Sequence, residues 1–409
     1  MKLLVLNCGS STLKFKLLRL ERGTVGSEVF TQLAQGVIDK MGDRATLEFS
    51  AESGVVLRKE TRVDNHGEAT RIVLEWIESA QLLKPEGLGA VAHRVVHGGE
   101  RFVEPTLIDA DVIEGLEAIG GLAPLHNGPA LSAIRSTREA LGSEVPMVAV
   151  FDTAFHRSLP DCASRYAIPQ GLAEKHSVRR YGFHGIAHRY MTERYAAITA
   201  VPVESMKLIT LQLGNGCSAT AVNGGRSVDT SMGFTPLEGL MMGTRCGDVD
   251  PSLAGFLAHQ EDVDVKEVEM WLNTQSGLLG VSGKSRDMRE LLDAEHCGDQ
   301  RAALAVEMFC YRVRKYIGAY IAVLGGADAI VFGGGIGENS PDVRARICSS
   351  LSWCGIILDA GRNKKAVGAE ARITKDNTKV HAYVVPVNEA TIIAQDTIRC
   401  VNYHLKQGE

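Results

Sequence analysis

Hydrophobic and polar positions follow the same plan in two segments of the chain. Residues 3–6 form an apolar run that ends in a glycine- and serine-rich turn, and residues 13–17 then alternate between apolar and polar. This pattern predicts a strand, a tight turn and a second strand. The plan returns at residues 207–225. One copy in each half of the chain suggests a duplicated fold. When the two segments are aligned on their asparagines, Asn7-x-x-Ser10-x-Thr12 matches Asn215-x-x-Ser218-x-Thr220.

Helical and strand patterns alternate along the rest of the chain. Apolar positions with a helical period predict helices, and short apolar runs bounded by glycine or polar residues predict buried strands. The predicted helices cover residues 68–83, 302–324 and 389–401, and the predicted strands cover residues 145–151 and 329–332. A chain of 409 residues exceeds one core of ordinary size. We therefore expect two α/β domains with a boundary near residue 150.

Composition and charge argue against several classes of protein. The formal charge is −5, so no basic surface predicts a nucleic-acid partner. No apolar run reaches the roughly 20 residues that a membrane helix needs, and residues 3–6 are too short for a signal-peptide core. The nine cysteines contain no CxxC pair, which favours reduced thiols over a disulfide framework or a zinc site. We expect a cytoplasmic protein without a membrane or nucleic-acid partner.

Three glycine-rich turns, at residues 7–12, 214–218 and 333–338, each follow an apolar strand. Polyphosphate binding needs close approach of the backbone and several convergent N–H groups, which glycine permits because it lacks a Cβ. Any one of these turns alone is more simply a hairpin, but three in this position favour phosphate binding. None contains the GxxxxGK[ST] pattern of a P-loop or a GxGxxG dinucleotide motif.

Several longer motifs carry a resemblance to a known family. They are Asn7-x-Gly-Ser-Ser-Thr-x-Lys14-Phe15, His93-Arg94-Val-Val-His97-Gly-Gly, Pro124-Leu125-His126-Asn127, Phe151-Asp152-Thr-Ala-Phe155-His156, Tyr181-Gly-Phe-His184-Gly, Asp229-Thr-Ser-Met-Gly-Phe-Thr-Pro236-Leu-Glu-Gly, Met242-Gly-Thr-Arg245-x-Gly-Asp-Val-Asp-Pro251, Gly335-Ile-Gly-Glu-Asn339 and Asn388-Glu389. In order and spacing, the sequence resembles the acetate and propionate kinase family over essentially its whole length.

This resemblance implies an α/β fold of two duplicated actin/hexokinase-like (ribonuclease H-like) domains with an active-site cleft between them. Residues 1–150 and 386–409 would form the N-terminal domain, with the last helix folded back onto it, and residues 151–385 the nucleotide-binding domain. The implied activity is reversible, magnesium-dependent transfer of a phosphoryl group from ATP to acetate, giving ADP and acetyl phosphate. Members of the family are typically homodimers, so a homodimer is also expected.

Two arginines are candidate ligands for the carboxylate and the phosphoryl group. Arg94 follows an apolar segment, and Arg245 lies in a loop rich in glycine and aspartate. The planar guanidinium fork matches carboxylate and phosphate oxygens, although a structural salt bridge is the alternative on residue type alone. The resemblance assigns both arginines to substrate binding and to stabilisation of transition-state charge.

The remaining catalytic and metal candidates are also assigned by resemblance. His184, in a tight loop, would contact the phosphoryl group during transfer, and Asp152, at the end of a predicted buried strand, would lie beside metal and substrate. Asn7 and Glu389 would organise Mg²⁺, which prefers oxygen ligands. A simple capping role at the start of the last helix is the alternative for Glu389.

The resemblance also gives a nucleotide set and a substrate pocket. Asn215 and Gly216 would hold the β-phosphate. Residues 287–289 would contact the adenosine, and the alternative for them is the start of a solvated helix. The full nucleotide set is Lys14, Asn215, Gly216, Asp287, Met288, Arg289, Gly335, Ile336, Gly337 and Asn339. The pocket set is Val96, Leu125, Phe183 and Pro236. Valine at position 96 resembles acetate kinases more than propionate kinases.

Alternatives to this interpretation come from inside and outside the family. They are a propionate kinase, a non-catalytic nucleotide-gated relative, a pyrophosphate-dependent enzyme, and a mechanism through a phosphoenzyme on Glu389 rather than direct in-line transfer. Cys246 stands beside Arg245 in place of the family's usual serine. A neighbouring arginine would make this thiol more acidic, so redox sensitivity is a further hypothesis.

Overall fold

The computed structural model describes residues 1–22, 28–122 and 124–407. It divides into two compact units. Unit 1 comprises Met1–Ala154 and Asn388–Glu409, and unit 2 comprises Phe155–Val387.

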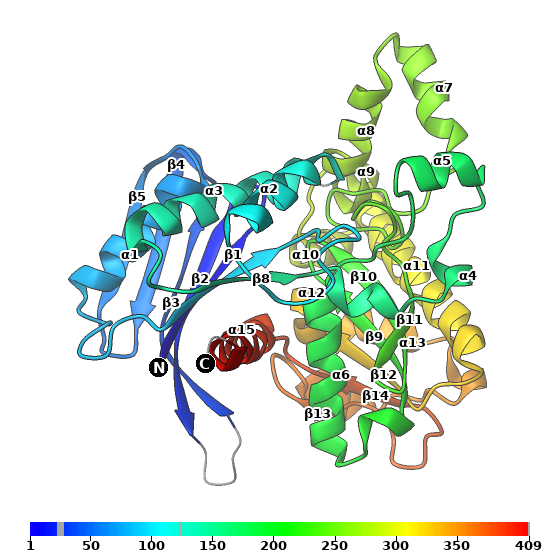
Figure 1. Ribbon diagram of the computed structural model, residues 1–409. Coiled ribbons are helices and arrows are strands. Elements are labelled where there is room, and N and C mark those ends of the chain that lie inside the picture. The colour runs from blue at the N-terminus through cyan, green and yellow to red at the C-terminus, as the bar shows by residue number, and fades with distance from the viewer. Residues whose placement is uncertain (23–27, 123, 408–409) are drawn as a thin grey trace. The chain divides into compact units, whose positions relative to one another are not determined.

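Unit 1 is built on an eight-stranded mixed sheet in the order β5-β4-β3-β2-β1-β6-β8-β7 (Figure 1). Strands β1 to β5 form antiparallel pairs, whereas β1, β6 and β8 run parallel to one another. The strands are β1 (Lys2–Cys8), β2 (Leu13–Arg22), β3 (Glu28–Asp39), β4 (Gly42–Ala51), β5 (Val56–Val63), β6 (Ala90–Val95), β7 (Thr106–Leu107) and β8 (Met147–Phe151).

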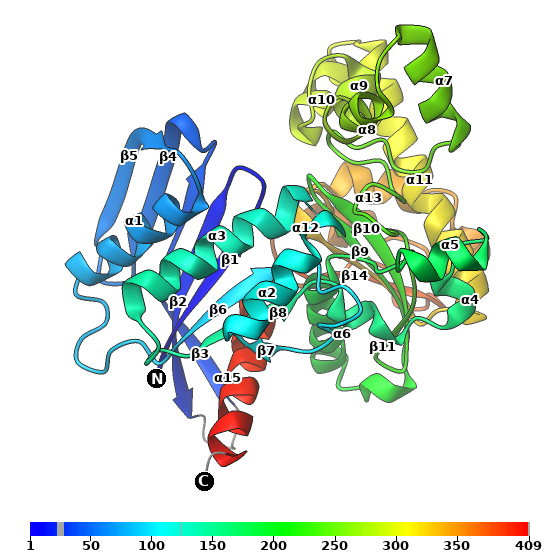
Figure 2. The same cartoon turned by 45° about the horizontal axis from the view of Figure 1, so that its top comes forward.

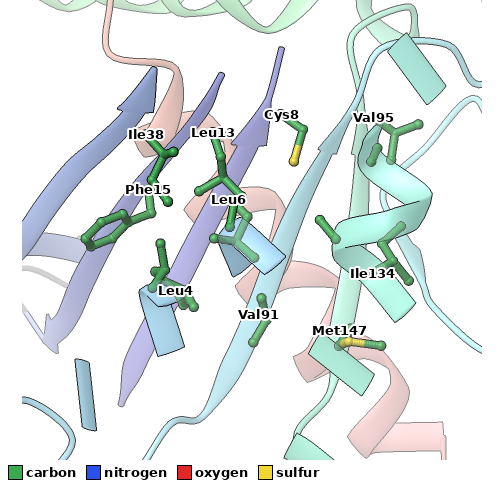
Figure 3. Packing of buried hydrophobic residues seen from close by; sticks show 14 of the residues in the cluster. Leu4, Leu6, Cys8, Leu13, Phe15, Ile38, Val91, Val95, Ile134 and Met147 are labelled. Carbon is green, nitrogen blue, oxygen red and sulfur yellow. The ribbon is translucent and has the colours of Figure 1, made fainter. Parts of the chain in front are cut away.

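The two faces of this sheet pack against different helices. On β1, Leu4, Leu6 and Cys8 belong to a core that includes side chains of α1 and α3 (Figure 3). Side chains alternate along a strand, so Leu3 and Val5 point to the opposite face, where α15 packs on β1, β6 and β8. The helices of unit 1 are α1 (His66–Ser79), α2 (Ala110–Ala118), α3 (Pro124–Leu141) and α15 (Glu389–Gln407).

Unit 2 contains a six-stranded sheet in the order β11-β10-β9-β12-β14-β13. In this sheet β9, β10 and β11 are antiparallel neighbours, and β9, β12 and β14 are parallel. The strands are β9 (Lys207–Leu213), β10 (Cys217–Asn223), β11 (Arg226–Thr230), β12 (Ala329–Gly333), β13 (Ala371–Arg372) and β14 (His381–Val384). The order and directions of β11-β10-β9-β12-β14 repeat those of β3-β2-β1-β6-β8, so the two units share one topology.

Helix α6 packs on the unit 2 sheet, where Met191 and Tyr195 join a core with Leu208 and Val331. Figure 2 shows α7 and α8 as a helical pair at one end of unit 2, away from its sheet. The helices of unit 2 are α4 (Asp161–Ser164), α5 (Gln170–Lys175), α6 (Gly185–Thr199), α7 (Ser252–Glu261), α8 (Val265–Thr274), α9 (Gly277–Ser282), α10 (Met288–His296), α11 (Gln300–Leu324), α12 (Gly334–Asn339), α13 (Pro341–Cys348) and α14 (Ala360–Lys365).

Most of the elements expected from the sequence are present, with two differences. Residues 334–339 form the short helix α12 instead of an open turn. The predicted helix at residues 68–83 begins at His66 and ends at Ser79, with Trp76 and Ile77 in the core. Within the described part of the chain, no helix is long and apolar enough to cross a membrane.

Candidate active site

The polar cluster of unit 1 lies where three parallel strands end. Asn7 on β1 is the register partner of Arg94 on β6, and the backbone N–H of Asp152, directly after β8, donates to the Val95 carbonyl. The strand alternation that puts Leu6, Val95 and their neighbours into the core turns Asn7, Arg94 and Asp152 toward the α15 face. Functional groups commonly collect at this edge of an α/β sheet.

Hydrogen bonds join these three residues to Glu389, the first residue of α15. Arg94 donates to both Asp152 oxygens, with Nη2–Oδ2 at 2.6 Å and Nε–Oδ1 at 3.3 Å. Arg94 Nη1 donates to Asn7 Oδ1 at 2.9 Å, and Asn7 Nδ2 donates to Glu389 Oε2 at 3.3 Å. Arg94 Nε also lies 3.9 Å from Glu389 Oε2. The structure therefore brings four of the expected site residues together within unit 1.

Burial and charge oppose each other in this cluster. Burial would lower the pKa of Arg94, but the carboxylates of Asp152 and Glu389 outweigh it and raise the pKa. Burial raises the pKa of Glu389, and the nearby Asp152 carboxylate adds to this, while Arg94 acts in the other direction. Two carboxylates close to one guanidinium give a site that would gain from a further cation.

Two lysines of β2 lie beside this cluster. Lys14 is exposed and is the register partner of Asn7, and its charge is among those that lower the pKa of Glu389. Lys16 donates from Nζ to Asn388 Oδ1 at 3.0 Å, next to Glu389. Lys14 belongs to the expected nucleotide set, whereas Lys16 was not expected. Only the alternation of residues 13–17 hinted that both share a face.

His66 is a second residue of unit 1 that sequence reasoning missed. Its Nε2 lies 2.8 Å from the Gly9 carbonyl oxygen, in the turn between β1 and β2. The first turn of α1 thereby supports this glycine-rich segment, which the Gly9 N–H closes by donating to the Thr12 carbonyl. Nothing in the sequence distinguishes His66 from any other histidine at the start of an amphipathic helix.

The turn of unit 2 between β9 and β10 is bordered by His184 and Arg245. A Cβ placed on Gly216 would lie 3.2 Å from His184 Cε1, 3.3 Å from His184 Nε2 and 3.7 Å from Arg245 Nη1. Asn215 lies in the same turn, where its carbonyl accepts from the Gly243 N–H at 3.0 Å. The structure therefore brings His184, Asn215, Gly216 and Arg245 together, around a position that tolerates no larger residue without a shift of its neighbours.

His184 has an unusual backbone. It occupies the N-cap position of α6 with φ of +55°, in the left-handed region. Histidine pays a steric cost there that glycine would not, and such strain gathers at functional sites. Its Nδ1 lies 2.9 Å from Ser218 Oγ on β10.

Arg245 differs from Arg94 in its partners. It donates from Nη1 to the Pro236 carbonyl at 3.1 Å and lies 3.7 Å from Met242 Sδ. Among the described residues, no carboxylate lies within salt-bridge distance of it. Burial lowers the pKa of Arg245. A half-buried guanidinium in such surroundings is a strong site for an anionic ligand.

The remaining nucleotide residues also lie in unit 2. A Cβ on Gly214 would lie 3.9 Å from the Gly335 nitrogen, so the second and third glycine-rich segments are neighbours. A Cβ on Gly335 itself would meet nothing within 4 Å. Ile336 is half-buried, Gly337 is buried, and Asn339 is exposed and donates to the Gly335 carbonyl at 3.0 Å.

The stretch at 287–289 forms the start of α10. Asp287 caps the helix by accepting from the Arg289 N–H at 2.9 Å and pairs with the Arg289 guanidinium at 2.6 Å. That guanidinium is exposed, and the Met288 side chain is buried. The capping role suggested by residue type is therefore present, and it leaves the nucleotide role of these residues as a prediction.

The expected pocket residues are divided between the units. Val96 is buried in unit 1, whereas Phe183 is buried and Pro236 half-buried in unit 2. Leu125 is the second residue of α3, but its side chain lies outside the described residues.

The expected acidification of the Cys246 thiol by Arg245 is wrong, and its redox sensitivity stays a hypothesis. Burial raises the pKa of its thiol instead of making it more acidic, and Asp248 adds to the rise. Arg245 is next to it in sequence, but the Cys246 thiol donates to the Gly247 carbonyl at 3.1 Å. Arg312, and not the adjacent Arg245, is the arginine that acts to lower the pKa of this thiol, so sequence proximity gave the wrong partner.

Comparisons with known proteins show what the whole chain is similar to. The model of the acetokinase family matches residues 2–395. The chain belongs to the acetokinase family. It is 47% identical over 408 residues to the acetate kinase of Solibacter usitatus, covering 98% of each chain. The Porphyromonas gingivalis acetate kinase structure superposes with a TM-score of 0.89 at 40% identity, covering 98% of this chain and 99% of that one. A propionate kinase structure from Francisella tularensis gives a TM-score of 0.88 at 39% identity, covering 97% and 98%.

Proposed function

We propose that this member of the acetokinase family catalyses reversible phosphoryl transfer between ATP and acetate. Acetate and ATP give acetyl phosphate and ADP, and the reverse reaction makes ATP. The observation that carries the proposal is the half-buried Arg245, which lacks a carboxylate partner among the described residues and borders the Gly216 turn with His184. A transferring phosphoryl group needs fixed donors and positive charge of this kind.

The transfer is direct. An oxygen of the acetate carboxylate attacks the γ-phosphorus, and the bond from that phosphorus to the β,γ-bridging oxygen breaks as ADP leaves. The acid is already ionised at neutral pH, so no general base is required. Arg245 and His184 donate hydrogen bonds to the equatorial oxygens as their charge develops.

Arg94 is proposed to bind the acetate carboxylate. A guanidinium has five N–H groups, and three of them donate to Asp152 and Asn7, which leaves one on each Nη atom. Asp152 fixes the plane of this guanidinium through two bonds, so the remaining donors are held in a defined direction. Asp152 is in this way a positioning partner of Arg94.

The donor set around Arg94 fits Mg²⁺. Asn7, Asp152 and Glu389 offer oxygen atoms, the ligands that Mg²⁺ prefers, and it is commonly held by one or two carboxylates together with substrate phosphates. Among the described residues no group of three or more His, Cys, Asp or Glu side chains forms a metal cluster. Bound Mg²⁺ would neutralise charge on the β- and γ-phosphates. Asn7 and Glu389 would hold it, with Asp152 beside it.

The nucleotide is proposed to use unit 2. Asn215 and Gly216 would bind the β-phosphate through the turn, and Gly335, Ile336, Gly337 and Asn339 would face the adenosine, with residues 287–289 opposite. The open space at Gly335 supports this assignment. Lys14 of unit 1 would add a cation to the phosphates.

Two further proposals concern assembly and compartment. Helices α7, α8 and α11 of unit 2 expose large apolar side chains, which supports a homodimer as the working form. These residues are Phe256, Val265, Met270, Leu304 and Tyr311. All nine cysteines are free thiols, which supports work in the reducing cytoplasm.

A second candidate is propionate as the preferred acid, which the similarity to the Francisella tularensis propionate kinase favours. One methylene in an apolar pocket is worth only about 1–3 kcal/mol, so both acids are expected to react. Val96 supports acetate as the better substrate.

The test is ATP-dependent acyl hydroxamate formation with Mg²⁺ and formate, acetate, propionate or butyrate. We expect product with acetate at the highest kcat/KM. A maximum at propionate would select the second candidate. Nucleotide binding without product from any acid would contradict the enzymatic proposal. A radiolabelled phosphoenzyme that forms in the absence of acid would contradict direct transfer and favour the phosphoenzyme mechanism.

A further inference from the structure

Four groups of unit 2 form a continuous line of hydrogen bonds that ends at His184. Thr210 Oγ1 on β9 lies 2.7 Å from His188 Nδ1, and His188 Nε2 lies 2.7 Å from Ser218 Oγ on β10. The same Ser218 oxygen lies 2.9 Å from His184 Nδ1. Thr210, His188 and Ser218 are completely buried. His188 lies one turn after His184 in α6, where its N–H donates to the His184 carbonyl.

The tautomer of His184 depends on the direction of its bond to Ser218. A hydroxyl carries one proton, so Ser218 can donate to only one of the two rings. If Ser218 donates to His184 Nδ1, a neutral His184 carries its proton on Nε2. If His184 Nδ1 donates to Ser218, the Nε2 of a neutral ring has no proton.

His188 passes this direction from Thr210 to Ser218. Burial, followed by the charges of His156 and His184, lowers the pKa of His188 well below its usual value, so its ring is neutral and has one N–H. When Thr210 donates to Nδ1, that N–H must be on Nε2, where it donates to Ser218. Ser218 is then free to donate to His184.

The proposed chemistry requires a proton on His184 Nε2. Phosphoryl oxygens only accept hydrogen bonds, and Nδ1 already bonds with Ser218. Nε2 is the ring nitrogen that lies nearest the Gly216 turn, 3.3 Å from the position of a Cβ there. A neutral donor also avoids a second cation beside Arg245, which would disfavour both charges.

We propose that His188 is a positioning residue: through Ser218, and with Thr210 behind it, it holds His184 in the tautomer whose proton is on Nε2. This inference rests on the proposed phosphoryl transfer, in which His184 is the catalytic residue. Its prediction about the ring proton can be measured without turnover.

The first measurement is the nitrogen spectrum of the enzyme labelled with ¹⁵N-histidine. The His184 signals are identified by their loss in His184→Gln. We expect the wild type to show the Nε2–H tautomer, and Thr210→Val, which removes the hydroxyl at nearly constant volume, to show a mixture. Thr220→Val is the matched control. Thr220 is the register partner of Thr210, is equally buried, and bonds instead with Thr230 at 2.9 Å.

Kinetics supply the second readout. Thr210→Val should lower kcat by at least about tenfold, the size that substitutions behind a functional group commonly reach. The KM values for acetate and ATP should stay unchanged, because Thr210 is not expected to touch either. Thr210→Ser should restore both spectrum and kcat, and Thr220→Val should alter neither. If Thr210→Val does not fold, Ser218→Ala should give the same loss of the Nε2–H tautomer.

The outcomes separate this inference from the proposed function. An Nδ1–H tautomer in the wild type, or a His184 spectrum unchanged by both Thr210→Val and Ser218→Ala, overturns the inference even if acetyl phosphate forms. A spectrum that responds as expected in an enzyme that forms no acetyl phosphate supports the hydrogen-bond line and overturns the proposed function.

Discussion

The two units share one topology but place different chemistry at its matching positions. The last antiparallel pair before the turn is Cys8 with Leu13 in unit 1 and Leu213 with Cys217 in unit 2. The preceding residue is Asn7 in unit 1, where its parallel partner is Arg94. In unit 2 the matching residue is Gln212, and its partner is Gly333.

The glycine at this position of unit 2 has a packing reason. A Cβ on Gly333 would lie 2.6 Å from Met191 Sδ and 2.7 Å from Val387 Cγ2. Unit 1 therefore projects charged side chains from its strand ends, whereas unit 2 offers glycine-rich backbone there and brings its arginine from the loop between β11 and α7. Both units have the same sheet topology, but they carry different functional groups on it.

The arginines show the consequence of this division. Two nitrogens of Arg94 donate hydrogen bonds to the Asp152 carboxylate. Arg245 donates to the Pro236 carbonyl instead, and no carboxylate of the described residues compensates for its partial removal from water. We therefore expect Arg94 to contribute strongly to the stability of its unit. Arg245 is expected to contribute little or to destabilise its unit until an anion binds.

The largest expected effect is on the activity of Arg245 variants. Arg245→Leu should lower kcat for acetyl phosphate formation by about 10³- to 10⁵-fold, as loss of a transition-state arginine does in other phosphoryl-transfer enzymes. The measurement is the hydroxamate assay at saturating acetate and ATP. Arg165→Leu, at an exposed arginine of unit 2, is the control and should retain full activity. A loss below about tenfold would show that Arg245 is structural.

The next effect is on stability and separates the two arginines. Arg94→Leu removes the guanidinium that pairs with the buried Asp152 carboxylate and should destabilise unit 1 by about 3–5 kcal/mol. Arg245→Leu should leave the stability of unit 2 unchanged or raise it. Hydrogen exchange of amides in β6 and in β9 reports the two units separately, which a single global transition would not.

A double variant sharpens this test. Arg94→Leu combined with Asp152→Leu removes both charges and should recover part of the lost stability. If the single variants of Arg94 and Arg245 destabilise their units equally, the contrast between a balanced and an unbalanced arginine is wrong.

Acid should affect the two units unequally. Burial lowers the pKa of His93 to about 3 and that of His97 to about 4 in unit 1, and lowers that of His188 well below its usual value in unit 2. Each native ring stays neutral, whereas the same ring in the unfolded chain binds a proton below pH 6.5. Stability therefore decreases as the pH is lowered from 6.5 to the pKa of the folded state. At pH 5, His93 and His97 each contribute a loss of about 2 kcal/mol. Smaller shifts at His66 in unit 1 and at His381 in unit 2 offset each other, so the two large shifts of unit 1 should make it unfold first.

Fluorescence can follow this difference, because Trp76 is the only tryptophan of unit 1 while Trp271 and Trp353 belong to unit 2. A variant that keeps Trp76 alone should report unfolding at a higher pH than a variant that lacks it. His93→Gln should flatten the pH dependence of unit 1, and His259→Gln, at an exposed ring, should not. Coincident transitions of the two reporters would contradict the unequal burial of histidine charge.

The sequence predicted the central elements well and the outer ones poorly. Apolar runs bounded by glycine located β1, β9 and β12, and the helical period located α11, which ends at Leu324 and is capped by Gly325 with φ of +64°. Strands β3 to β5 were not predicted. They form one edge of their sheet, and β5 is largely exposed with only Val63 buried, so its pattern carries little hydrophobic signal.

The repeated fold that the sequence predicted is present, but the alignment of the two segments on their asparagines was wrong. Matching Asn7 with Asn215 placed a strand residue opposite a turn residue, because the turn spans 9–12 in unit 1 and only 214–216 in unit 2. The position that matches Asn7 is Gln212. Site residues that come from far along the chain, such as Glu389, followed from family resemblance and not from pattern. The partners of Lys16, His66 and His188 depend on tertiary contacts that no local pattern encodes.

The smallest expected effect concerns which unit selects the acid. Val96 of unit 1 and Phe183 of unit 2 are both buried members of the expected pocket set. Removing two methyl groups in Val96→Ala should raise the ratio of kcat/KM for propionate to that for acetate by about tenfold, since one methylene in an apolar pocket is worth about 1–3 kcal/mol. Phe183→Leu is the matched variant in unit 2. It keeps the backbone carbonyl of residue 183, which lies within hydrogen-bond distance of His156 Nε2. A larger change in the ratio for Phe183→Leu would move acid selection to unit 2, and unit 1 would then serve the carboxylate charge alone.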